Sequence, residues 1–139
     1  VFAGPLQVAI SPEALAEPID NVRAAVMQAR GGSCGALRSE PLVERAAYLV
    51  NQSIDGWIDH TIRFAPIDKP LPILKDLGYP GGKAAMALGA SKNEADAIKG
   101  MLLEAWASIP DCSYSDYGVS ILMNKSRNEF LTAVVVAGA

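Results

Sequence analysis

The last third of the chain carries a β-hairpin whose second strand restricts the fold of everything before it. Apolar residues alternate along residues 117–123, a polar turn follows at 124–128, and residues 130–136 return as a β-rich strand. The run Thr-Ala-Val-Val-Val at 132–136 lacks polar alternation, which is typical of a central strand covered on both faces. Helices must therefore pack on both sides of the sheet. We expect an α+β fold, a three-layer α-β-α sandwich with a largely antiparallel central sheet.

Proline and capping residues mark where the helices begin. The expected starts are Ser11-Pro12-Glu13, Pro18, Ser39-Glu40-Pro41, Leu71 and Ser91. The helix from Leu71 should end at Gly78, and the helix from Ser91 should run to Pro110. The segment Ser91-Lys92-Asn93-Glu94 fits a capping box, in which serine and glutamate satisfy each other's backbone donors. These helices predict an N-terminal arm or short helix at 1–18 and a single domain at 19–139.

Between the helices, residues 84–90 predict a short buried strand, and residues 59–69 have no clear period and predict an irregular connection. The two cysteines, Cys34 and Cys112, can be two buried thiols or one disulfide. Both lie among turn-forming residues, whereas buried free cysteines usually lie within core elements. We therefore favour the disulfide. Closing a loop of this length stabilises a fold by about 4.5 kcal/mol in the chain-entropy model.

Composition excludes several classes of function. The net charge is −3 and the basic residues are scattered, which gives no general attraction to nucleic acid. No apolar run reaches the roughly 20 residues of a transmembrane helix. The chain has one histidine, His60, and its two cysteines lie far apart, so it lacks the ligand spacing of a metal site. We expect no cofactor, no metal and no catalytic residue.

Short motifs in a fixed order suggest a family. They are Asn21, Arg23, Leu37, Glu40-Pro41-Leu42, Ala46-Ala47, Gly78-Tyr79, Gly89, Glu94 and Tyr117-Gly118-Val119-Ser120. Over residues 19–137 this order resembles the CAP superfamily of cysteine-rich secretory, antigen-five and pathogenesis-related proteins and their bacterial relatives. The resemblance implies the α-β-α fold, an exported protein of a bacterium, and lipid or sterol as the most natural small ligand.

The chain departs from this family where the family binds metal. CAP proteins with a central cleft typically present two histidines and two glutamates there. His60 stands roughly where the first histidine falls, but Gly82-Lys83-Ala84 replaces the strand that supplies an acid. Residues 107–112 replace the segment that supplies the second histidine. The resemblance therefore implies the fold without the family's metal chemistry.

The remaining candidate site residues are aromatic and acidic. Trp57, Phe64, Tyr79 and Trp106, with Met101, can form a half-exposed apolar groove for a ligand or partner, although core packing competes with this interpretation. His60 can be a general base oriented by Asp59, or an ordinary loop residue. The acid pairs Asp55/Asp59 and Asp111/Asp116 can serve hydrolysis of sugars, but aspartate beside turns is ordinarily structural.

We therefore expect a secreted or cell-envelope binding module that takes a lipid, another apolar ligand or an envelope protein. Its ligand-binding residues would be His60, Trp57, Phe64, Tyr79 and Trp106. The alternative hypothesis is a hydrolase that uses His60 with a nearby carboxylate in a CAP-type cleft. A structural domain within a longer exported protein is a third hypothesis.

Overall fold

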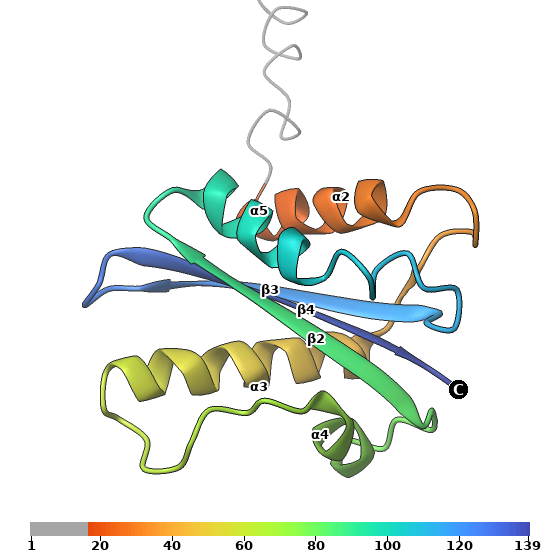
Figure 1. Cartoon of the computed structure of the whole chain (residues 1–139). Helices are drawn as coiled ribbons and strands as arrows, with labels where there is room; N and C mark the ends of the chain where they lie inside the picture. Colours follow the sequence, from red (N-terminus) through yellow and green to blue (C-terminus); the bar gives the residue numbers. More distant parts are fainter. Residues whose placement is uncertain (1–16) are drawn as a thin grey trace, which may run out of the picture.

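The computed structural model describes residues 17–139, so the expected helix start at Ser11 lies outside the described part. The described elements, in chain order, are α2 (Pro18–Arg30), β1 (Arg38–Ser39), α3 (Pro41–Ile58), α4 (Pro70–Asp76), β2 (Lys83–Ser91), α5 (Glu94–Glu104), β3 (Asp116–Asn124) and β4 (Glu129–Gly138). Mixed helices and strands confirm the predicted α+β class (Figure 1). No described helix is long and apolar enough to cross a bilayer.

The sheet has the strand order β1-β3-β4-β2. Strands β3 and β4 form the predicted C-terminal hairpin, and β2 adds to β4 as a second antiparallel neighbour. The short strand β1 pairs in parallel with the start of β3. Residues 131–138 of β4 are all buried, as expected for a central strand.

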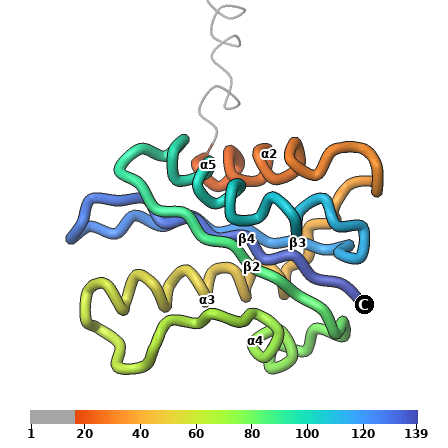
Figure 2. Tube along the Cα trace, viewed as in Figure 1, coloured from red at the N-terminus to blue at the C-terminus, as the bar shows by residue number. Residues whose placement is uncertain are grey.

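Helices lie on both faces of this sheet. Figure 2 traces α2 and α5 above it and α3 and α4 below it. Successive residues of β4 point to opposite faces, so Val134 and Val136 join the apolar cluster that includes α2 and α5. Val135 and Ala137 join the cluster that includes α3 and α4. Each face of the central strand therefore has its own apolar core.

Two predictions around α5 were wrong. The helix begins at Glu94 with Asn93 as its N-cap, whose side chain accepts a hydrogen bond from the backbone N–H of Asp96 at 3.1 Å. Ser91 is the last residue of β2, paired with Phe130, and lies two residues before the N-cap; its hydroxyl oxygen accepts from the N–H of Asn93 at 3.2 Å. The helix ends at Glu104, and turns fill the stretch up to Pro110.

The strand predicted at 84–90 is present, and it extends over Lys83–Ser91. It was expected to be buried, yet only Ala87 is buried and most of its other residues are partly exposed. The reason is its position at the edge of the sheet, where no strand from residues 17–139 covers its outer side. The side chain of Glu104 accepts a hydrogen bond from the outward backbone N–H of Leu88 at 3.1 Å and protects part of that edge.

The disulfide predicted between Cys34 and Cys112 is present and joins residues 78 apart in the sequence. It ties the loop after α2 to the segment before β3. Beside it, the buried guanidinium of Arg30 donates hydrogen bonds to four backbone carbonyls. These belong to Gly35 at 3.1 Å, Ile109 at 2.7 Å, Asp111 at 2.8 Å and Tyr114 at 2.8 Å. The arginine and the disulfide therefore hold the same two chain segments together.

Candidate functional site

A cleft with a volume of about 340 Å³ lies between the C-terminal half of α3, the 59–69 connection and the start of α4. Five of its lining side chains are large and apolar, namely Leu49, Ile62, Phe64, Ile67 and Ile73. The described lining also includes Gly56 and four polar residues, namely Gln52, Ser53, Asp55 and Thr61. This mixture of apolar walls and few polar groups is typical of small-molecule sites.

The chain builds this cleft by folding the irregular connection back onto α3. The N–H of Thr61 donates to the carbonyl of Gly56 at 2.8 Å, which turns the chain at the end of the helix. Farther along, the N–H of Ile67 donates to the hydroxyl oxygen of Ser53 at 3.1 Å. A Cβ at position 56 would lie 2.8 Å from a methyl carbon of Ile62, so glycine permits the close approach of this side chain to the helix. These contacts hold the connection over the helix and leave the cleft between them.

The polar wall of the cleft is anchored to the hairpin. Asp55 accepts a hydrogen bond on Oδ1 from the amide of Asn124 at 2.8 Å. Asn124 is fully buried, and its amide also donates to Asp59 at 3.1 Å. The β3–β4 turn therefore fixes the C-terminal end of α3, and with it the position of the Asp55 carboxylate.

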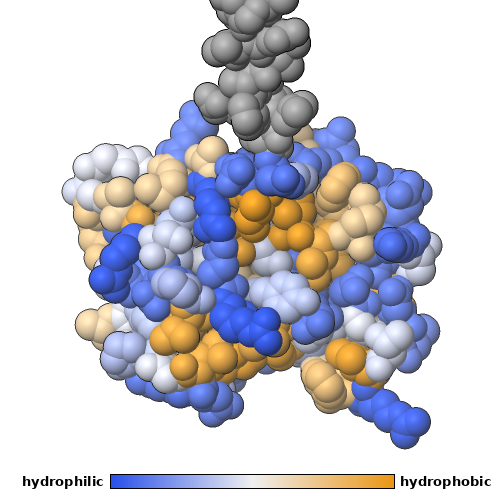
Figure 3. Space-filling view, turned by 180° about the vertical axis from the view of Figure 1, so that it is seen from behind, coloured by the Kyte–Doolittle hydropathy of each residue, from blue (hydrophilic) through white to orange (hydrophobic). Residues whose placement is uncertain are grey.

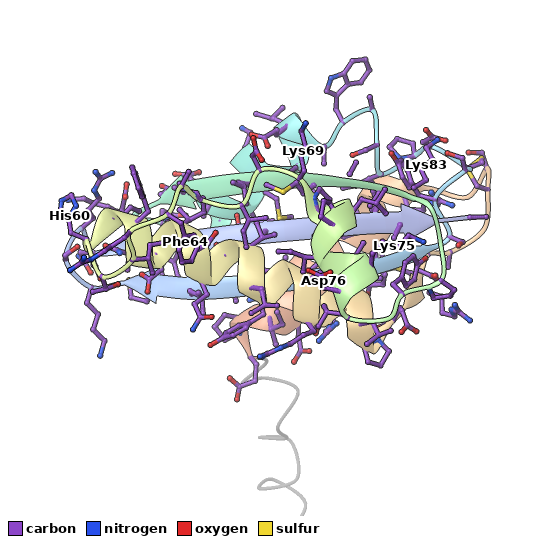
Figure 4. All side chains as sticks on the ribbon, turned by 90° about the horizontal axis from the view of Figure 1, so that it is seen from below. His60, Phe64, Lys69, Lys75, Asp76 and Lys83 are labelled. Carbon is purple, nitrogen blue, oxygen red and sulfur yellow. A yellow bond between two sulfur atoms is a disulfide. The ribbon has the colours of Figure 1, made fainter. Side chains whose placement is uncertain are left out.

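The structure gives His60 no catalytic partner in the described residues. It is an exposed residue with φ 58° just after α3, and it does not line the cleft. Figure 4 shows it at the end of the molecule, beyond Phe64. Its neighbour Asp59 accepts hydrogen bonds from Ser126 at 2.5 Å and from Asn124, and these bonds lower the pKa of Asp59. Asp59 is therefore committed to the hairpin turn and does not orient the imidazole.

The four predicted aromatic residues do not form one groove. Phe64 lines the cleft and is 60 % exposed, whereas Trp57 is exposed on α3 but does not line it. Trp106 follows α5, on the opposite side of the sheet, and is 76 % exposed. Tyr79 and Met101 are buried in the two separate cores. The sheet lies between α3 and α5 and so separates the predicted aromatic side chains. Sequence spacing alone could not show which face of the sheet each of them lies on.

Tyr79 belongs to a second depression, of about 360 Å³, at the start of β3. Its hydroxyl donates to Oδ2 of the buried Asp116 at 2.6 Å, and Nε of Arg38 donates to Oδ1 at 2.9 Å. Burial and the neighbouring carboxylate raise the pKa of Tyr79. Arg38 was missed in the sequence because its partner lies on a distant strand. These groups satisfy one another and tie β1 to β3, which is a structural role.

The carboxylates of the second acid pair, Asp111 and Asp116, bind different partners. Asp111 accepts hydrogen bonds from the N–H of Ser113 at 2.9 Å and from its hydroxyl at 2.7 Å, which forms a local turn. Asp116 is occupied by Tyr79 and Arg38. Within residues 17–139, no group of three or more His, Cys, Asp and Glu side chains is placed to hold a metal ion.

Outside the cleft, the surface is mixed. On the rear face, hydrophobic side chains gather in separate patches bounded by hydrophilic ones (Figure 3). A further apolar depression of about 340 Å³ lies between the start of α2 and the hairpin, lined by Ile19, Ile121, Leu122, Met123 and Phe130 with Glu17 and Pro18. Among the described residues of this lining, Glu17 is the one that carries a charge, and it is the first residue that the structure describes.

Comparison with known proteins identifies a similar fold but no family. No family model matches the chain, and no curated protein matches it. Among solved structures, it is similar to an outer surface protein from Borrelia burgdorferi, with a TM-score of 0.68 and 11 % sequence identity. The match covers 87 % of this chain and 92 % of that one. At this identity, the likeness shows that the two chains share a fold.

Proposed function

We propose that this chain is a non-catalytic binding module of a secreted or cell-envelope protein, and that its α3 cleft takes a lipid or another small apolar ligand. The observation that carries the proposal is the cleft itself. Its walls combine five large apolar side chains with a few polar groups, and His60 stands outside it. The volume of about 340 Å³ is at the lower end of the range for small-molecule sites.

Two observations support a location outside the cytoplasm. Disulfides persist in oxidising compartments and are rare in the cytosol, and this chain has one between Cys34 and Cys112. The fold is also shared with a protein described as an outer surface protein. Thiol titration under denaturing, non-reducing conditions of protein from its native source tests this part of the proposal. We expect no free thiol, and two free thiols would contradict the proposed location outside the cytoplasm.

We also propose that the chain is a CAP-like protein that lacks the metal-binding tetrad, the two histidines and two glutamates of the family's cleft. The helix order and the C-terminal hairpin support it, as does the pairing of two motif residues, Asn21 and Glu94, by a hydrogen bond of 2.9 Å. Calorimetric titration with zinc tests the loss of the tetrad. We expect no stoichiometric site, whereas a site that His60→Ala abolishes would contradict this interpretation and revive the hydrolase alternative.

Binding in the cleft can be tested with Nile red, a neutral dye whose fluorescence rises in apolar surroundings. We expect saturable binding to the wild-type chain and weaker binding to Ile62→Ala and Phe64→Ala, which remove parts of the apolar wall. Trp106→Ala is the matched control because it removes a larger exposed aromatic side chain on the other side of the sheet. Loss of binding in the control variant, or no saturable binding to the wild type, would contradict the proposal.

A further inference from the structure

We propose that Asp55 makes the α3 cleft selective for amphiphiles with a cationic, hydrogen-donating head group, such as a primary alkylammonium, over amphiphiles with a carboxylate. This inference rests on the proposed binding function and adds the chemistry of the ligand's polar end. It follows from the charge of the cleft and from the directions of its hydrogen bonds.

Among the described residues, Asp55 is the only charged side chain that lines the cleft. It is half-buried, and it forms no salt bridge within residues 17–139. Its one hydrogen bond there comes from the neutral amide of Asn124 and occupies Oδ1. The negative charge at the cleft therefore has no cationic partner in this part of the chain, and a half-buried carboxylate attracts a cation more strongly than an exposed one does.

The two side-chain hydroxyls of the cleft direct their donors away from a ligand. The hydroxyl of Ser53 donates to the carbonyl of Val50 at 2.6 Å, and the hydroxyl of Thr61 donates to the carbonyl of Gly56 at 3.2 Å. The amide nitrogen of Gln52 donates one of its two N–H bonds to the hydroxyl of Tyr48 at 3.3 Å. Two side-chain acceptors are left without a partner among residues 17–139, Oδ2 of Asp55 and the side-chain oxygen of Gln52, beside one remaining N–H of Gln52. A ligand that brings its own N–H donors satisfies them, whereas a carboxylate meets like charge and acceptors.

Neighbouring charges do not reverse this preference. Asp59, one helical turn beyond Asp55, is a second carboxylate bonded to Ser126 and Asn124, and the positive charge of Arg127 in the hairpin turn also lowers the pKa of Asp59 and offsets part of its charge. Arg63 in the connection is exposed and does not line the cleft. The five apolar side chains of the lining and Asp55 together make the site amphipathic, and its volume of about 340 Å³ suits one short alkyl chain.

The test compares three ligands with the same ten-carbon chain, decylamine, 1-decanol and decanoate, at pH 7 and below the concentrations at which they aggregate. Affinity is measured on the full chain by displacement of Nile red. We expect decylamine to bind about tenfold more tightly than decanoate, with decanol between them. This ranking in the wild-type protein needs no variant, so it stands even if a substitution impairs folding.

Asp55→Asn then identifies the group responsible. It keeps the size of the side chain and an oxygen that can accept from Asn124, and it should bring the affinities for decylamine and decanoate close to that for decanol. Asp20→Asn, an exposed acid on α2, is the matched control and should leave the ranking unchanged. If none of the three ligands displaces the dye, the binding function itself fails. If all three bind equally, or decanoate binds best, the cleft binds ligands but the selectivity inferred here is wrong.

Discussion

At the scale of single residues, Arg30 shows how a buried charge can organise two distant segments. Its side chain is 3 % exposed and donates to four carbonyls around the disulfide. Arg30→Met should lower the free energy of unfolding by about 3 kcal/mol or more, because several buried carbonyls lose their donors together. Urea denaturation measures this loss. The control is Arg45→Met on the exposed face of α3, for which we expect less than about 1 kcal/mol. Equal losses would contradict the role given to Arg30.

The contribution of Tyr79 to the free energy of unfolding should depend on pH. Its pKa is raised in the folded protein, so the folded state holds the phenolic proton more tightly than the unfolded state does. The stability that this contact contributes is therefore complete below a pH of about 10, the ordinary tyrosine pKa, and is lost as the pH rises above it. Tyr79→Phe should be less stable than the wild type at pH 7 by about 1–3 kcal/mol, because Asp116 loses a buried donor. The difference should shrink between pH 10 and pH 11 in urea denaturation, and a constant difference would contradict this account.

At the scale of elements, helix α3 approaches the sheet closely enough to require glycine. A Cβ on Gly118 would lie 2.2 Å from the backbone nitrogen of Glu44, so Gly118→Ala must move the helix. We expect a loss of about 3 kcal/mol or more in the free energy of unfolding. Gly100→Ala in α5 is the control. Its Cβ would lie 4.0 Å from the Cα of Gly89, so the substitution should stabilise the helix by about 0.5–1 kcal/mol. Thermal unfolding of both variants checks the two opposite signs.

The elements also show which features were predictable from sequence. The hairpin and the helices from Pro18 and Pro41 were predicted because alternation and proline position are local signals. The end of β2 was misjudged because the pairing of Ser91 with Phe130 is not visible in the sequence around Ser91. The prediction of one aromatic groove was wrong for a related reason. The strand order decides which helix covers which face, and this order is not visible in the sequence around each aromatic residue.

For the molecule as a whole, the candidate site depends on contacts between distant segments. The cleft forms because the connection after α3 returns to Ser53 and Gly56, and because Asn124 from the hairpin holds Asp55 and Asp59. Phe64 was the one predicted aromatic that lines it. Asp55 was considered in the sequence only as half of an acid pair. Its place beside apolar side chains of another segment became apparent only in three dimensions.

The central claim is that ligand binding is located in the α3 cleft, and NMR of the isotopically labelled full chain tests it most directly. On titration with decylamine, we expect backbone amide shifts to change at Ser53–Gly56, at Thr61–Ile67 and near Ile73. The amides around Trp106, on the other side of the sheet, should stay unchanged. Shift changes centred on α5, or spread evenly over exposed apolar residues, would contradict the claim.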